Sequence, residues 1–144
     1  MRPRGLIDTG ALLALLDRSD RWHKPCVDAF SNAPLPLATT AAILAELFHL
    51  LGPDKHELKA AWNLLRTGAI QVLAIDDQDM PAIETLMLRY SDRPMDFADA
   101  TLVHLAERES IAYILTVDYT DFAIYRIRSK RRFDIHPRPA VRRQ

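Results

Sequence analysis

Acidic side chains that follow predicted strands are the residues in this sequence best suited to chemistry. Asp8 and Asp118 each follow a short apolar run, and Asp96 and Asp99 lie three residues apart at the start of a predicted helix. That spacing puts the two helical carboxylates on one face of the first turn. Ligands of open parallel sheets bind beyond the carboxyl ends of the strands, so we expect these acids to meet at one site.

A fifth carboxylate, Glu46, lies in an apolar helical segment. It is the only charged residue between Leu35 and Asp54, and burying a carboxylate is costly unless it is paired or bound to a metal. Clustered carboxylates repel one another, which raises their pKa values unless a cation is present. Oxygen ligands without clustered Cys or His favour Mg²⁺ or Mn²⁺, which activate water and stabilise an in-line phosphoryl displacement. The predicted chemistry is therefore phosphodiester hydrolysis.

Purely structural roles compete with this interpretation at each acid. Asp8 and Asp118 could each cap the segment that follows, and Asp96 could be an N-cap with Asp99 at the third helical position. Glu46 could point to solvent. Four independent caps need not gather at one end of a sheet, so we favour a shared site. Asp96 is treated as secondary because its capping role competes best.

Apolar runs of strand length alternate with helical segments along the sequence. The run at 111–117 is short, continuous and rich in β-branched residues, as in a strand buried on both faces of a parallel sheet. This alternation predicts a three-layer α/β/α domain with a mostly parallel central sheet of about five strands. We expect strands at 5–8, 35–38, 70–75, 111–117 and 133–135, and helices at 11–16, 22–30, 41–51, 54–65, 76–90 and 96–110, with a short turn or helix after 118.

Length and composition are those of one globular domain. The sequence has 144 residues, of which 49% are hydrophobic and 26% charged. The single cysteine, Cys26, fits a reducing compartment. The amino-terminal stretch resembles a signal peptide, but Asp8 interrupts its apolar part and no small-residue cleavage site follows. We expect a cytoplasmic protein, since no apolar segment approaches the ~20 residues of a membrane span.

Basic residues are concentrated towards the carboxyl end, although the formal net charge is zero. From residue 126 onward there are eight Lys and Arg residues and one acid, out of totals of 19 and 19. A basic tail beside an acidic body suits a polyanionic partner, because Lys and Arg contacts to phosphates release counterions. A solvated tail without a partner is an equal alternative.

Four segments of the sequence together resemble the acidic motifs of the PIN domain family, in order and spacing, over nearly the whole chain. They are Leu6-Ile7-Asp8-Thr9, Glu46 in AELFHLL, Met95-Asp96-Phe97-Ala98-Asp99-Ala100, and Leu115-Thr116-Val117-Asp118 followed by Asp121-Phe122. The resemblance implies a metal-dependent ribonuclease. It also implies site residues: Asp8, Glu46, Asp99 and Asp118 as ligands of Mg²⁺ or Mn²⁺, Asp96 as an auxiliary acid, and Thr116 as a hydroxyl near the metal.

A stand-alone domain of this size is similar to the VapC toxins of bacterial toxin–antitoxin pairs. This resemblance implies an RNA substrate, a cognate antitoxin protein, a homodimer and no membrane association. We expect a PIN-like nuclease domain at 1–136 and a flexible basic tail at 137–144. The basic run at 126–132 matches no motif of the family, and its role stays open.

Other chemistries fit the sequence less well. A phosphoaspartyl hydrolase needs a second Asp two residues after the first, where this chain has Gly10. There is no G-x-x-x-x-G-K-[ST] phosphate loop. The five histidines lack the spacing of a zinc site, although His49 lies one turn after Glu46. The alternative function is a non-catalytic domain whose acidic pocket binds a basic protein partner.

The sequence also predicts positions for one histidine and for the aromatic side chains. His104 is expected on a helix surface or partly buried. Trp22, Trp62 and the Phe and Tyr residues are expected in the core rather than as platforms for bases. Tyr119 and Tyr125, beside the basic run, could contact RNA.

Overall fold

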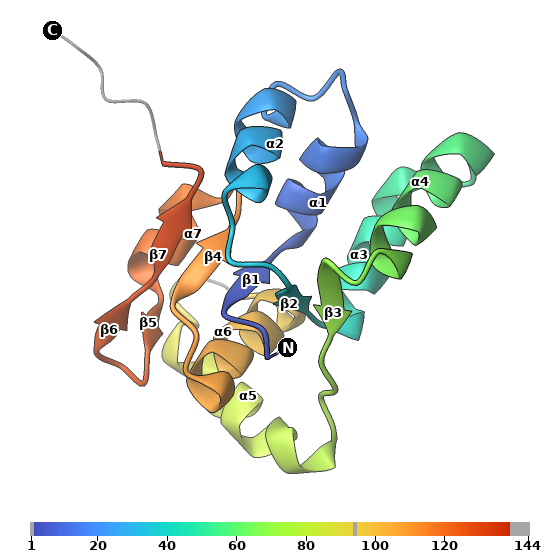
Figure 1. Cartoon of the computed structure of the whole chain (residues 1–144). Helices are drawn as coiled ribbons and strands as arrows, with labels where there is room; N and C mark the ends of the chain where they lie inside the picture. Colours follow the sequence, from blue (N-terminus) through green and yellow to red (C-terminus); the bar gives the residue numbers. More distant parts are fainter. Residues whose placement is uncertain (1, 94, 139–144) are drawn as a thin grey trace, which may run out of the picture.

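A five-stranded parallel sheet forms the centre of the computed structural model, which describes residues 2–93 and 95–138 (Figure 1). The strand order is β3-β2-β1-β4-β7, and every neighbouring pair is parallel. In the central strand, Leu6 pairs with Ala38 on one side and Ile114 on the other. The strands are β1 (Gly5–Ile7), β2 (Leu37–Thr39), β3 (Ile70–Val72), β4 (Tyr113–Leu115) and β7 (Asp134–His136).

Helices connect the strands and cover the two faces of the sheet. Because parallel crossovers are right-handed, the reversal of direction after β3 puts the later helices on the opposite face. In Figure 1, α1 and α2 lie on one side of the strands and α5 and α6 on the other. The helices are α1 (Thr9–Leu16), α2 (His23–Ser31), α3 (Ala41–Leu51), α4 (Lys55–Arg66), α5 (Met80–Arg89), α6 (Phe97–Glu109) and α7 (Tyr119–Ile124), with a 3₁₀ turn η1 (Asp77–Asp79) before α5.

The predicted three-layer architecture and the parallel sheet of five strands are confirmed. Polar caps start the helices as expected: Thr40 accepts the Ile43 N–H at the start of α3, and Asp54 accepts two N–H groups at the start of α4. Gly52, at φ +72°, ends α3. Each strand of the main sheet has three residues, so β7 has its predicted length and the other four strands are shorter than predicted.

A small antiparallel sheet in the basic run was not predicted. It pairs β5 (Arg126–Ile127) with β6 (Arg131–Arg132), and the turn between them holds Arg128 and Ser129 at positive φ. Strands of two residues rich in arginine carry no apolar alternation, so sequence patterns cannot reveal them. Of the predicted tail, Pro137 and Arg138 are described, whereas 139–144 lie outside the described residues.

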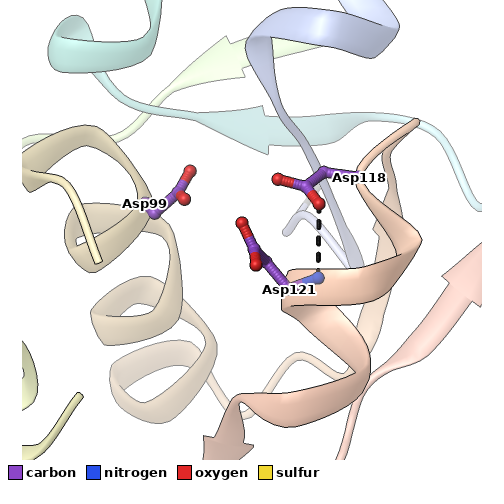
Figure 2. Close-up of side chains that lie close together, drawn as sticks. All are labelled: Asp99, Asp118 and Asp121. Atoms are coloured by element: carbon purple, nitrogen blue, oxygen red, sulfur yellow. Dashed lines mark hydrogen bonds between the residues drawn. The ribbon is translucent and has the colours of Figure 1, made fainter. Parts of the chain in front are cut away.

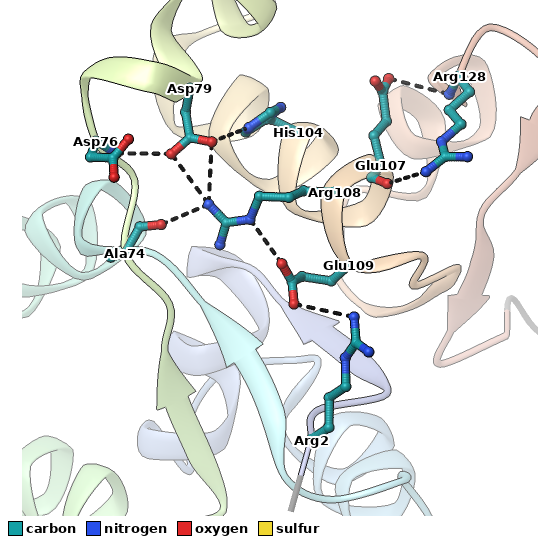
Figure 3. A network of polar contacts seen from close by, with 9 residues as sticks. All are labelled: Arg2, Ala74, Asp76, Asp79, His104, Glu107, Arg108, Glu109 and Arg128. Carbon is teal, nitrogen blue, oxygen red and sulfur yellow. Dashed lines mark hydrogen bonds and ion pairs between the residues drawn. The ribbon is translucent and has the colours of Figure 1, made fainter.

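The helix α6 runs through the core and ends in a polar network (Figure 3). His104 is buried, which corrects the expected surface or partly buried position, and its Nε2 lies 2.7 Å from Asp79 Oδ1. Arg108 donates to both oxygens of Asp79 and to the Ala74 carbonyl. This network ties α6 to η1 and to the segment after β3. The hydrogen bond from the Asp76 N–H, then His104, lowers the pKa of Asp79 to about 2.

Two further expectations concern the positions of the tryptophans and membrane-spanning helices. Trp62 is 51% exposed and stacks on Phe48 at 5.1 Å between ring centroids, so it is not a core residue, whereas Trp22 is partly buried against the core. Within the described residues, no helix combines the length and the apolar character that crossing a membrane requires.

Candidate metal centre

The carboxyl ends of β1 and β4 open into a cleft of about 360 Å³. All five acids predicted from the sequence line it, and Asp121 joins them as a sixth. The lining residues are Asp8, Thr9, Gly10, Leu13, Glu46, Leu50, Asp96, Asp99, Val117, Asp118 and Asp121. His49 is exposed and is not among them. The convergence of strand ends that the sequence predicts is therefore present.

Three of the acids both cap a helix and face the cleft. Asp8 accepts the Ala11 N–H at the start of α1, Asp96 accepts the Asp99 N–H at 2.7 Å at the start of α6, and Asp118 accepts the Asp121 N–H at the start of α7. Capping and gathering are thus not alternatives. Each cap fixes one carboxylate oxygen, and the helix N-termini bring partial positive charge towards the acids.

Asp8 is the most buried of these acids and is held from two sides. It is 6% exposed, with Oδ1 accepting the Ala11 N–H at 3.1 Å and Oδ2 accepting the Thr116 hydroxyl. The same Thr116 oxygen accepts the Asp118 N–H at 2.9 Å. One buried hydroxyl therefore joins the acid after β1 to the acid after β4.

Asp99, Asp118 and Asp121 form a compact triad in the cleft (Figure 2). Each of the three offers a carboxylate oxygen, and these atoms lie within 4.8 Å of one another. Asp121 belongs to the sequence motif that contains Asp118, but the sequence alone predicts no site role for it. Its signal is its spacing, since it sits at the third position of a helix capped by Asp118, which turns its side chain back towards the cap.

Asp99 also accepts a hydrogen bond from a buried tyrosine. Tyr125 is 1% exposed and its hydroxyl donates to Asp99 Oδ2 at 3.4 Å. Its ring is buried between Tyr90 and Phe122, as expected for most of the Phe and Tyr residues, so the alternative of an RNA contact is wrong. Tyr119 is 47% exposed at the start of α7, so its contact with RNA stays a prediction.

Glu46 comes to the cleft from α3, which packs against α6. The Thr40 and Thr101 hydroxyls, 2.8 Å apart and buried, fix α3 against α6. Glu46 is partly buried, so neither full burial nor full exposure describes it. Within the described residues it accepts no hydrogen bond, which leaves its carboxylate available to a ligand in the cleft.

The crowding of carboxylates changes their acidity. Burial, outweighing the hydrogen bonds from Thr116 and Ala11, raises the pKa of Asp8 to about 7. Burial, and then the charges of Asp96 and Asp8, raises the pKa of Asp99 to about 8. Burial and the neighbouring Asp121 raise the pKa of Asp118. Without a cation, burial and mutual repulsion therefore oppose the ionisation of all these carboxylates near neutral pH.

A known family matches the part of the chain that contains these acids. The sequence profile described as the PIN domain matches residues 5–127. The chain belongs to the PIN domain family. Among curated PIN proteins it is 30% identical to the ribonuclease VapC26 of Mycobacterium tuberculosis, over 92% of this chain and 99% of the relative.

Solved PIN structures share the fold at lower identity. The sarcin-ricin loop cleaving toxin VapC20 of M. tuberculosis has a TM-score of 0.71 and 19% identity, covering 81% of this chain and 91% of that one. A toxin–antitoxin complex from Klebsiella pneumoniae has a TM-score of 0.63 and 18% identity, covering 83% and 91%. At these identities the likeness concerns the fold of the PIN domain alone.

The donor set of this PIN domain fits a hard divalent cation. Its donors are carboxylates from separate elements, and no His or Cys of the described part joins the triad of Asp99, Asp118 and Asp121. Carboxylates are the ligands that Mg²⁺ and Mn²⁺ prefer. A cation would also relieve the repulsion that raises the pKa values of Asp8 and Asp99.

Proposed function

We propose that this PIN domain is a Mg²⁺- or Mn²⁺-dependent endoribonuclease that hydrolyses RNA phosphodiester bonds. The observation that carries the proposal is the meeting of six acids from four separate segments in one cleft. The near full-length likeness to a protein named a ribonuclease adds to it.

The proposed metal ligands are Asp8, Glu46, Asp99 and Asp118, to which we now add Asp121. When bound, the cation supplies Lewis acidity towards water and the phosphate oxygens. The chain itself does the positioning: Thr116 orients Asp8, and the Tyr125 hydroxyl orients Asp99.

We further propose that the protein is the toxin of a type II toxin–antitoxin pair. The relatives named VapC and the structure of a toxin–antitoxin complex support this role. Its partners would then be RNA, a cognate antitoxin protein and a second copy of the chain in a homodimer. The nuclease domain would span 1–136, with 137–144 as a basic tail.

The test is cleavage of total cellular RNA by the purified protein, with Mg²⁺ or Mn²⁺ and with EDTA. We expect defined cut ends that need the cation. Asp99→Asn should abolish cleavage while the far-UV circular dichroism spectrum stays unchanged. Asp92→Asn is the matched control, because Asp92 is exposed and outside the lining of the cleft. Equal cleavage by wild type and Asp99→Asn, at equal purity, would reject the assigned role.

The alternative function, a non-catalytic pocket for a basic protein partner, uses the same excess of acids. It predicts that no RNA is cut under any metal condition. The cleavage experiment with and without EDTA therefore separates the two functions.

A further inference from the structure

The proposed cleft lacks positive charge of its own. Its described lining contains six acids and no Lys or Arg. RNA carries one negative charge per phosphate, so a strand that approaches such a cleft is repelled unless cationic groups meet it at the rim. The proposed cation offsets part of this charge, and a basic side chain beside the acids would help to bring the phosphate backbone to the site.

Most arginines that make contacts in the described part of the chain are committed to structural bonds elsewhere. Arg108 binds Asp79 and the Ala74 carbonyl. Arg126 donates from Nη1 to three carbonyls at the end of α7, and Arg128 donates to the Glu107 carbonyl. These guanidinium groups hold helix ends and loops together, so they are poorly placed to bind a ligand in the cleft.

Arg93 differs from these arginines because it pairs with an acid that lines the cleft. It lies on the loop between α5 and α6, where its N–H donates to the Tyr90 carbonyl at 3.0 Å and anchors the loop backbone. Its Nε lies 3.5 Å from Asp121 Oδ1, and the side chains of Arg93 and Asp121 are 51% and 33% exposed. Among the described ion pairs, this is the one that joins a Lys or Arg to an acid lining the cleft.

The guanidinium of Arg93 keeps donors that no hydrogen bond uses. Its ion pair with Asp121 is given by Nε at 3.5 Å, and the side chain makes no hydrogen bond to any described residue. A planar guanidinium presents paired donors that match two phosphate oxygens.

We propose that Arg93 binds a phosphate of the RNA at the mouth of the cleft, and that Asp121 orients its guanidinium there. This inference rests on the proposed ribonuclease function and names the residue that receives the substrate backbone. The competing explanation is an ordinary exposed ion pair, which contributes little to stability and nothing to binding.

The salt dependence of RNA binding separates these explanations. A residue that contacts a phosphate releases counterions, so its loss lowers the slope of log K against log salt by about 0.7 for single strands. The measurement is fluorescence anisotropy of a labelled mixed-sequence single-stranded RNA over a KCl series with Mg²⁺ present. All variants carry Asp99→Asn, so that the RNA stays intact.

We expect Arg93→Ala to weaken RNA binding several-fold and to lower the slope, whereas Arg93→Lys keeps the slope because it keeps the charge. Arg66→Ala is the matched control. It removes the same charge from the exposed last turn of α4, which leads to the amino end of β3, at the opposite end of the sheet from the cleft. Unchanged melting temperatures confirm that the variants fold.

Three outcomes would overturn the inference. If Arg93→Ala keeps the parental slope and affinity, Arg93 is only a surface ion pair, even where the wild type cuts RNA. If Arg66→Ala lowers the slope as much as Arg93→Ala, the effect is one of net charge. If the wild type does not cut RNA and the parent does not bind it, the proposed function fails and the inference fails with it.

Discussion

At the scale of single residues, Thr116 connects two of the acids of the site. Its hydroxyl donates to Asp8 and accepts the Asp118 N–H, and the side chain is 2% exposed. The hydrogen bond to Asp8 opposes the effect of burial, because it lowers the pKa of this carboxyl. Thr116 therefore sets both the orientation of Asp8 and its acidity.

Replacing Thr116 by Val keeps the shape of the side chain and removes both hydrogen bonds. We expect the rising limb of the pH–rate profile for RNA cleavage to move to higher pH, since Asp8 becomes harder to ionise. Leaving buried groups unpaired should also lower stability by about 1–3 kcal/mol. The measurement is the cleavage rate against pH, together with urea unfolding. Thr116→Ser keeps the hydroxyl and should keep the wild-type profile; a shift of equal size in both variants would contradict this account.

The acids of the cleft differ in how far sequence reveals them. Asp8, Asp99 and Asp118 are visible because they stand at strand ends and helix starts, and Glu46 because it is isolated in apolar sequence. The roles of Asp121 and Tyr125 depend on how α7 turns its first residues towards α6, which is a matter of tertiary packing. Tyr125 looks like an RNA contact in the sequence and is buried in the structure.

At the scale of elements, α6 starts with an acid, Asp96, that both caps the helix and lines the cleft. Asp96 is exposed, accepts the Asp99 N–H and adds its charge to those that raise the pKa of Asp99. Its two roles can be separated because Asn caps a helix as well as Asp does.

Asp96→Ala should lower the free energy of unfolding by about 1 kcal/mol, whereas Asp96→Asn should leave it nearly unchanged. If Asp96 acts mainly as a cap, Asp96→Asn should also keep most of the RNA cleavage. Urea unfolding and cleavage rates of both variants check this. A stable Asp96→Asn protein without activity would instead show that the carboxylate charge is required.

The elements that sequence reveals are those with apolar periodicity or polar caps. The helices α1 to α6 and the strands of the parallel sheet have one or the other. The β5–β6 pair has neither, because its residues are mostly arginines held by a turn at positive φ. The interpretation of the basic run as a tail therefore missed that its first part is folded onto α6, where Arg128 bonds Glu107.

At the scale of the whole molecule, the acid cluster makes stability depend on pH. The pKa values of Asp8 and Asp99 are raised from 3.8 to about 7 and about 8 on folding. Between about pH 4 and pH 8 the folded protein then binds more protons than the unfolded chain, so its stability falls as pH rises. The lowered pKa of Asp79, about 2, acts only at lower pH, where stability is lost as pH falls.

We therefore expect the melting temperature in EDTA to decrease from about pH 5 to about pH 8. Added Mg²⁺ should raise it more at the higher pH, because ionised carboxylates bind the cation more tightly. Differential scanning fluorimetry over this range gives the measurement. Asp99→Asn should flatten the decrease, and since all histidines are kept, their titration cancels in the comparison. A variant with the wild-type slope would contradict the assignment.

The parallel pairing of β1 with β4 has a consequence for the timing of synthesis. Asp8 leaves the ribosome well before β4 and the adjoining Asp118, which follow about a hundred residues later. A growing chain holds only part of the acid set until β4 has inserted next to β1. If the proposed activity is toxic to the cell that makes it, the nascent protein is harmless until β4 has been made. A binding partner can be produced during that interval, before the cleft is complete.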